Sequence, residues 1–177
     1  MKVVFLDRDG TLLNDPLDER VDRLDKIELL PDSIEALKYL ADNGFAAVII
    51  TNQAGIAEGR ITEEKFWTIQ NEVLRQLAPS GIRFLKTYMN REAGPDASEW
   101  RKPGPKMLLQ AAEDLDLNLS EIYMVGDSQT DIQAGIAAGC KGGILVETAR
   151  NHRVISPDAI YSAPSLLDAA RYVVANS

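Results

Sequence analysis

The stretch Val3 to Asp15, VVFLDRDGTLLND, decides the fold prediction because it joins an apolar run to a cluster of acidic residues. Residues 3–6 are continuously apolar, as in a strand that is covered on both faces of a sheet. Asp7 and Asp9 follow at once, and Gly10 comes directly after them. Two carboxylates this close repel each other unless a cation lies between them. The stretch therefore predicts a buried strand that ends at a functional site.

Four further apolar runs resemble this first strand. They cover residues 46–50, 84–89, 122–125 and 144–146. Between and after them lie helical patterns with an apolar face, over residues 32–44, 62–78, 104–115, 130–139 and 165–174. Alternating buried strands and amphipathic helices predict an α/β fold, a three-layer sandwich around a mostly parallel sheet. The active site of such a sheet lies beyond the carboxyl ends of its strands.

Capping residues support the predicted helix boundaries. Asp32 and Thr62 stand just before two of the helical patterns, where a side-chain oxygen can accept a backbone N–H bond. Ser165 with Asp168 fits a capping box, and Gly44 fits the end of the first helix.

Composition excludes several classes of protein. The chain has 177 residues and a formal net charge of −8, so we expect one domain over residues 1–177 and no nucleic-acid or anionic-membrane partner. The single cysteine permits no internal disulfide. No apolar run approaches the roughly 20 residues of a membrane-spanning helix, and the N-terminal stretch turns acidic too early for a signal peptide. These features predict a cytoplasmic protein, for which we expect a monomer or weak oligomer.

A second acidic pair follows another predicted strand. The motif VGDSQTD places Asp127 and Asp131 beyond residues 122–125. Taken alone, Asp127 could cap the next helix, and the first motif could be a solvated turn. Carboxylates from neighbouring strand ends would repel strongly in a crevice, and Mg²⁺ prefers such hard oxygen ligands. The two motifs together predict a magnesium site.

Two further motifs offer groups that bind anions. TNQAG, which contains Thr51 and Asn52, supplies a hydroxyl, an amide and loop N–H groups. Lys102 lies in WRKPGPK, where Pro103 and Pro105 stiffen the backbone around it. Each motif alone also fits an ordinary turn or a solvated lysine. Together with the acidic motifs they predict phosphoryl transfer.

The ordered set DRDGT, TNQ, RKP and GDSQTD resembles the haloacid dehalogenase (HAD) superfamily of phosphatases. The sequence is most similar to the histidinol-phosphatase and D-glycero-D-manno-heptose 1,7-bisphosphate phosphatase group, from Val3 to about Val146. The resemblance implies a HAD-like Rossmannoid sandwich, and the spacing between motifs leaves no room for a cap domain. It also implies a Mg²⁺-dependent phosphomonoester hydrolase with an aspartyl-phosphate intermediate, acting on a small sugar phosphate.

The resemblance also implies roles for the acidic residues. Asp7 would be the nucleophile and a magnesium ligand. Asp9 would protonate the leaving alcohol and then activate water, with its backbone carbonyl facing the metal. Asp127 would complete the protein ligands. Asp131 would orient Lys102 or a metal-bound water.

Substrate contacts are implied at the same strand ends. Thr51 and Lys102 would hold the phosphoryl oxygens. The further residues expected to bind substrate are Arg8, Asp15, Asn52, Gln53, Ala54, Arg60 and Arg101. Of these, Arg101 could pair with a second phosphate of a bisphosphate substrate.

The sequence departs from this group before the RKP motif. Relatives commonly carry a cysteine and histidine zinc loop there, whereas residues 90–100, NREAGPDASEW, contain neither residue. We therefore expect no structural zinc, and we expect packing between Pro95 and Trp100 to hold the segment instead.

Other functions remain as alternatives. Histidinol phosphate and the 3′-phosphate of a polynucleotide are the alternative substrates, although the acidic charge counts against DNA. A phospho-aspartate receiver module is the alternative from another class. It would need its acceptor aspartate after the third strand, where this chain has Met89 and Asn90.

Overall fold

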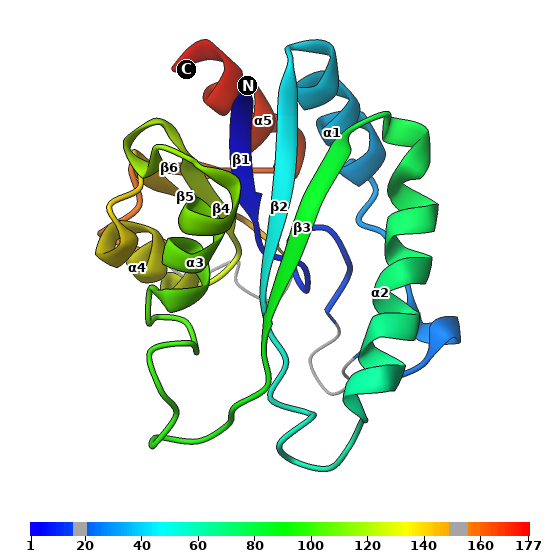
Figure 1. Cartoon of the computed structure of the whole chain (residues 1–177). Helices are drawn as coiled ribbons and strands as arrows, with labels where there is room; N and C mark the ends of the chain where they lie inside the picture. The colour runs from blue at the N-terminus through cyan, green and yellow to red at the C-terminus, as the bar shows by residue number, and fades with distance from the viewer. Residues whose placement is uncertain (16–20, 149–155) are drawn as a thin grey trace.

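The computed structural model describes residues 1–15, 21–148 and 156–177, and in these the strands form one parallel sheet (Figure 1). Its strand order is β3-β2-β1-β4-β5-β6. The strands are β1 (Lys2–Leu6), β2 (Phe45–Asn52), β3 (Arg83–Asn90), β4 (Tyr123–Gly126), β5 (Gly142–Val146) and β6 (Tyr161–Ala163). The five predicted strands are confirmed.

Helices cover both faces of the sheet, so the predicted three-layer α/β sandwich is confirmed (Figure 1). The helices are α1 (Ser33–Asp42), α2 (Glu63–Leu77), α3 (Lys106–Leu115), α4 (Gln129–Ala138) and α5 (Leu166–Ala175). The apolar sides of α1, α2 and α5 share one core with the sheet, and those of α3 and α4 share the core on the opposite face. Among the described residues, no helix has both the length and the apolar character needed to cross a membrane.

Helix caps follow the sequence in most places. Thr62 accepts a bond from the Lys65 N–H at 3.2 Å, and Ser165 accepts one from the Asp168 N–H at 3.1 Å, as expected. Asp32 is the N-cap residue of α1, as predicted, but its side chain makes no capping bond to α1. It instead accepts the N–H of Leu167, in the first turn of α5, at 2.8 Å.

The order of the strands determines where the site lies. β1 pairs with β2 on one side and with β4 on the other. The chain thus runs from β1 to one side through β2 and to the other side through β4, which makes the end of β1 a topological switch point. The Asp7 N–H donates to the Val125 carbonyl at 2.9 Å, which fixes Asp7 directly beyond the end of β1.

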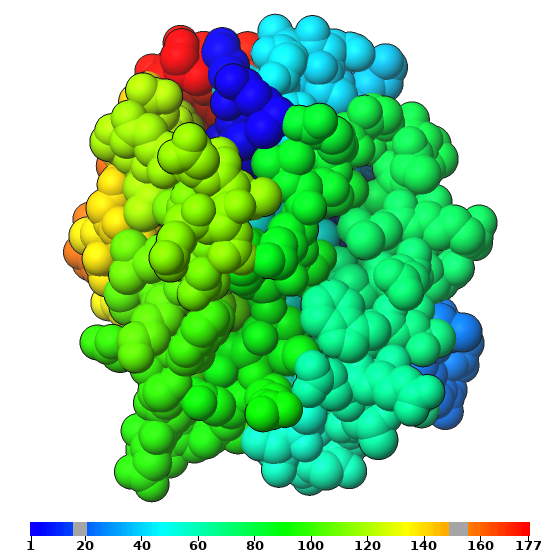
Figure 2. All heavy atoms as spheres, viewed as in Figure 1, coloured from blue at the N-terminus to red at the C-terminus, as the bar shows by residue number. Residues whose placement is uncertain are grey.

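Two long segments extend beyond the same end of the sheet. They are residues 53–62, between β2 and α2, and residues 91–105, between β3 and α3. In the space-filling view of Figure 2 their atoms, cyan to teal and green respectively, lie next to each other along the lower edge of this face.

Candidate active site

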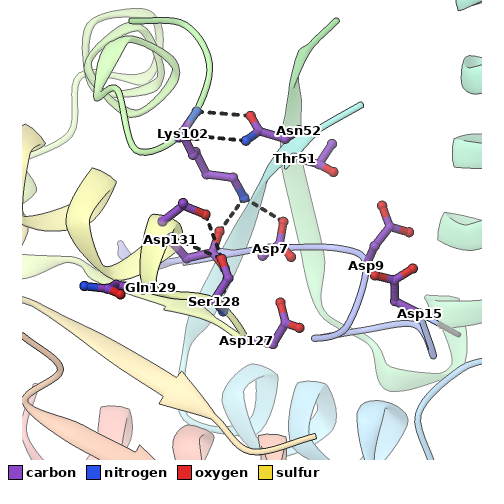
Figure 3. A pocket seen from close by; sticks show the side chains of 11 residues that line it. Asp7, Asp9, Asp15, Thr51, Asn52, Lys102, Asp127, Ser128, Gln129 and Asp131 are labelled. Carbon is purple, nitrogen blue, oxygen red and sulfur yellow. Dashed lines mark hydrogen bonds and ion pairs between the residues drawn. The ribbon is translucent and has the colours of Figure 1, made fainter. Parts of the chain in front are cut away.

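A pocket of about 370 Å³ lies beyond the carboxyl ends of β1, β2 and β4 (Figure 3). Its lining residues are Asp7, Asp9, Asp15, Thr51, Asn52, Lys102, Asp127, Ser128, Gln129, Thr130 and Asp131. All five predicted catalytic residues and the three predicted metal ligands are therefore brought together in one cavity.

Three carboxylates form a compact group within this pocket. Asp7, Asp127 and Asp131 each offer an oxygen, and these oxygens all lie within 4.8 Å of one another. Asp7 follows β1, Asp127 follows β4, and Asp131 lies in the first turn of α4. Carboxylate oxygens at this spacing fit a small hard cation such as Mg²⁺. The side chain of Asp9 lies outside this group.

The carboxylates destabilise one another's ionised forms. Burial raises the pKa of Asp7 to about 7, since the opposing effect of the nearby Lys102 ammonium is partly offset by the charge of Asp131. Burial, followed by the charges of Asp7 and Asp131, raises the pKa of Asp127 to about 8. A cation held by these oxygens would favour their ionised forms at neutral pH.

Lys102 is the cation that the chain itself supplies to this group. Its side chain is only 3% exposed, and its Nζ lies 2.7 Å from Asp7 Oδ1 and 2.6 Å from Asp131 Oδ1. Nζ also donates to the carbonyl of Ile50 at 2.8 Å. Burial alone would lower the pKa of Lys102, but the charges of Asp131 and Asp7 outweigh it and raise the pKa. The ammonium group is therefore charged and fixed in direction.

The backbone of Lys102 is held as firmly as its side chain. Asn52, at the end of β2, accepts the Lys102 N–H at 3.1 Å and donates to the Lys102 carbonyl at 3.1 Å. This paired contact is visible in Figure 3. Asn52 therefore connects the segment after β3 to the end of β2, and its amide was expected to contact substrate instead.

Asp131 has two structural tasks. One oxygen contacts Lys102, and Oδ2 accepts the N–H of Ser128 at 3.0 Å and its hydroxyl at 2.6 Å. Ser128 and Asp131 form a capping box at the start of α4. The helix cap is thus Ser128, so the alternative interpretation of Asp127 as the cap is wrong.

Glycines let these groups approach one another. Gly10 has φ of +88°, and a Cβ built there would lie 2.3 Å from Asp127 Oδ2. A Cβ on Gly126 would lie 2.4 Å from the Asp131 carboxyl carbon. Any larger residue at either position would push a carboxylate out of the pocket.

Asp9 lies at the side of the pocket rather than among the clustered carboxylates (Figure 3). Arg8 Nε donates to both Asp9 oxygens at 3.1 Å, and Arg8 Nη2 donates to Oδ2 at 2.9 Å. Gln53 Nε2 donates to the same Oδ2 at 2.7 Å and to the hydroxyl of Thr51 at 2.9 Å.

The other residues expected to bind substrate divide into two groups. Asp15 and Asn52 line the pocket. Arg8 is 1% exposed and Ala54 is also buried, and Gln53, Arg60 and Arg101 lie outside the lining. Arg60 pairs with Glu58, and Arg101 donates to the carbonyl of Glu92 at 2.9 Å.

Ser128, Gln129 and Thr130 also line the pocket and were not predicted as site residues. The available signal was their place inside the GDSQTD motif, between two predicted acidic residues.

Glu92 links the two ends of the segment before the RKP motif, where the sequence has no cysteine or histidine. Its carboxylate accepts the Ser98 N–H at 2.7 Å and the Ser98 hydroxyl at 2.8 Å. Pro95 and Trp100 are both exposed, so the expected packing between them does not account for the shape of this segment. A carboxylate and a serine instead link its two ends.

β3 ends at Asn90, at one edge of the sheet and without a carboxylate. A receiver module would need its acceptor aspartate there, so this alternative lacks its central residue.

The comparisons with known proteins agree with this geometry. D-glycero-beta-D-manno-heptose-1,7-bisphosphate 7-phosphatase of Yersinia pestis is 38% identical over 83% of this chain and 81% of its own length. The Escherichia coli K12 protein of that name is 35% identical over 93% and 87%. The histidine biosynthesis bifunctional protein HisB of Spirosoma linguale is 36% identical over 79% of this chain, which spans only 37% of that relative's length.

A solved structure has the same fold throughout. The D,D-heptose 1.7-bisphosphate phosphatase from B. bronchiseptica, complexed with magnesium and phosphate, superposes with a TM-score of 0.91 at 30% identity, covering 100% of both chains. The profile of the family "haloacid dehalogenase-like hydrolase" matches residues 14–139, most of the chain. The resemblance seen in the motifs is thereby confirmed, and the chain belongs to the haloacid dehalogenase-like hydrolases.

Proposed function

We propose that this hydrolase is a magnesium-dependent phosphatase that acts on a small sugar phosphate through a phosphorylated Asp7. The observation that carries the proposal is the placement of the Asp7 carboxylate. It is buried at the base of the pocket, 2.7 Å from the Lys102 ammonium and within 4.8 Å of the Asp127 and Asp131 oxygens. A nucleophile, a fixed cation and a metal site thus share one cavity.

The first step transfers the phosphoryl group to the enzyme. An Asp7 carboxylate oxygen forms a bond to phosphorus while the bond from phosphorus to the ester oxygen breaks. The leaving oxygen takes the proton from the carboxyl group of Asp9 and departs as an alcohol. Lys102 and the hydroxyl of Thr51 face the oxygens on which negative charge develops.

The second step restores the enzyme. A water oxygen bonds to phosphorus, its proton goes to the Asp9 carboxylate, and the bond between phosphorus and Asp7 breaks. Inorganic phosphate leaves, and Asp9 again carries the proton for the next substrate.

The residues present fit a magnesium ion. Asp7 and Asp127 would hold it, together with the backbone carbonyl of Asp9, while Asp131 is committed to Lys102 and Ser128. When bound, the ion supplies positive charge that stabilises the ionised carboxylates and the phosphoryl oxygens.

The proposed substrate is a heptose 1,7-bisphosphate or a similar sugar phosphate. This follows from the names of the relatives that match this chain over most of both lengths. The position of Arg101 favours a substrate with a second phosphate, because Arg101 lies beside Lys102. To bind that phosphate, its side chain would turn from the Glu92 carbonyl towards the pocket. Histidinol phosphate is the second candidate, because a HisB protein matches over 79% of this chain.

A substrate panel tests the proposal. Phosphate release is measured with Mg²⁺ on heptose bisphosphates, histidinol phosphate and a 3′-phosphorylated oligonucleotide. We expect the sugar bisphosphate to be the best substrate, and the net charge of −8 to make the oligonucleotide the poorest. Asp7→Asn should abolish turnover while the protein folds normally. Full activity in that variant would remove Asp7 from the role of nucleophile.

A further inference from the structure

Arg8 is a buried cation whose role the proposed mechanism leaves open. Its side chain is 1% exposed, and its guanidinium group lies 5.1 Å from the centre of the Phe66 ring. Burial of a charged side chain is unfavourable unless that charge has a specific partner. The ion-pair partner of Arg8 in the structure is Asp9, the next residue in the chain.

The guanidinium group is anchored from behind by two other elements. Arg8 Nη1 donates to Gln70 Oε1 on α2 at 3.4 Å, and Gln70 Nε2 donates to the Thr87 hydroxyl on β3 at 3.2 Å. Gln70 is fully buried. The direction of Arg8 is therefore determined by packed secondary structure rather than by the loop that carries it.

The contacts of Asp9 are unequal on its two oxygens. Oδ2 accepts bonds from Arg8 Nε, Arg8 Nη2 and Gln53 Nε2, at 3.1, 2.9 and 2.7 Å. Within the described part of the chain, Oδ1 accepts only the bond from Arg8 Nε, at 3.1 Å. A carboxylate oxygen has room for about two strong hydrogen bonds. Oδ2 is therefore saturated, whereas Oδ1 still has room for a further hydrogen bond.

We propose that Arg8, anchored by Gln70, is a positioning residue that holds the Asp9 carboxylate so that Oδ1 is the oxygen left to meet the leaving group of the substrate. The inference rests on the proposed phosphatase function. A planar guanidinium group that binds side-on fixes the plane of a carboxylate, which a lysine ammonium cannot do. The earlier expectation that Arg8 binds substrate gives way to this role, because Arg8 is buried beside Asp9 and lies outside the pocket lining.

A pair of substrates with different leaving groups separates positioning from general structural damage. The leaving group of a sugar phosphate is a basic sugar oxygen, which needs the proton from Asp9. The leaving group of p-nitrophenyl phosphate is p-nitrophenolate, which is stable without a proton. The parameter kcat/KM covers only the steps up to loss of the leaving group. It therefore reports proton donation without the later hydrolysis of phosphorylated Asp7.

Arg8→Lys keeps the charge but loses the planar fork. We expect its kcat/KM for the sugar phosphate to fall by about 10²-fold, through kcat rather than KM, and its kcat/KM for p-nitrophenyl phosphate to fall by less than about 5-fold. Gln70→Met leaves Arg8 and Asp9 unchanged. It should also lower kcat/KM more for the sugar phosphate than for p-nitrophenyl phosphate, but by a smaller factor than Arg8→Lys. It keeps the test decisive if Arg8→Lys does not fold.

Arg23→Met is the matched control. Arg23 pairs with Asp25 two residues away, through a similar bidentate contact on the surface. The Arg23→Met substitution should leave kcat/KM unchanged for both substrates. Equal losses on both esters in Arg8→Lys and Gln70→Met, or no loss, would overturn the inference. A wild-type protein that hydrolyses neither ester would overturn the proposed function and the inference with it.

Discussion

Removal of Mg²⁺ should make the stability of this protein depend strongly on pH. Asp7 and Asp127 are buried next to each other and to Asp131, and their pKa values are raised to about 7 and about 8. In the unfolded chain both carboxyl groups titrate near their ordinary value of 3.8. Between about pH 4 and pH 8 the folded protein therefore binds more protons than the unfolded chain.

The sign and size of the effect follow from linkage. Where the folded state binds more protons, the free energy of unfolding decreases as pH rises. The contribution of these two carboxyl groups to stability is therefore complete below about pH 4 and is lost progressively between about pH 4 and pH 8. One pKa unit corresponds to about 1.4 kcal/mol. Raising the pKa of Asp7 from 3.8 to about 7 therefore corresponds to about 4 kcal/mol. About 3 kcal/mol of this falls between pH 5 and pH 7, which for a domain of this size is a change of roughly 6–12 °C in Tm.

The assay is thermal unfolding in a chelator at pH 5, 6, 7 and 8, repeated with saturating Mg²⁺. We expect Tm to fall with pH in the chelator, and Mg²⁺ to raise Tm far more at pH 8 than at pH 5. Asp127→Asn removes one carboxylate and should flatten the pH dependence. Asp42→Asn, on the exposed surface of α1, should leave it unchanged.

Two outcomes would refute this reasoning. One is a Tm that stays constant from pH 5 to pH 8 in the chelator, since the buried carboxylates would then ionise without penalty. The other is equal stabilisation by Mg²⁺ at both ends of the range, since the ion would then bind elsewhere.

Three substitutions test other parts of the site. Lys102→Met should abolish activity and lower the free energy of unfolding by about 3–5 kcal/mol, because it leaves two buried carboxylates without their cation; a denaturant titration that finds less than about 1 kcal/mol would contradict this. Glu92→Gln should loosen residues 92–98 and speed their cleavage in limited proteolysis, with Tm unchanged, and unaltered cleavage would exclude this role. Gly10→Ala should weaken Mg²⁺ binding, measured by calorimetry, at least about 10-fold, because the added Cβ displaces Asp127. Gly44→Ala is the control, since Gly44 also has a positive φ, +81°, but nothing lies within 4 Å of an added Cβ, so Mg²⁺ binding should not change. Equal Mg²⁺ affinity in the two variants would contradict the steric argument.

The sheet could be predicted because its strands are buried on both faces. Near-continuous apolar runs identify such strands without reference to the rest of the chain. β6 was missed because it has three residues, YSA, and depends on its pairing with β5 rather than on its own pattern. The capping bond of Asp32 was assigned to the nearer helix, because sequence proximity cannot show that α5 lies beside the start of α1.

The site could be predicted in position but not in direction. Motif order placed Asp7, Thr51 and Asp127 at neighbouring strand ends, and the structure has them there. Asp7 and Asp9 line the pocket, whereas the side chain of Arg8, between them in the sequence, is buried against Phe66 and Gln70. Motif matching treats the three residues alike, which explains why Arg8 was expected to contact substrate.

Charge balance favours one lysine and one divalent cation at this place. Asp7, Asp127 and Asp131 together carry a charge of −3 when ionised, and Lys102 contributes +1, which leaves −2. Lys102 Nζ lies 2.6 Å from Asp131 and 2.7 Å from Asp7 and is shared between them, so the remaining −2 is spread over the three carboxylates. A single Mg²⁺ balances that charge. Asp131 would thus support the proposed metal site without touching the ion, because in its absence the whole charge of Lys102 would fall on Asp7 and weaken both the proposed metal site and the proposed nucleophile.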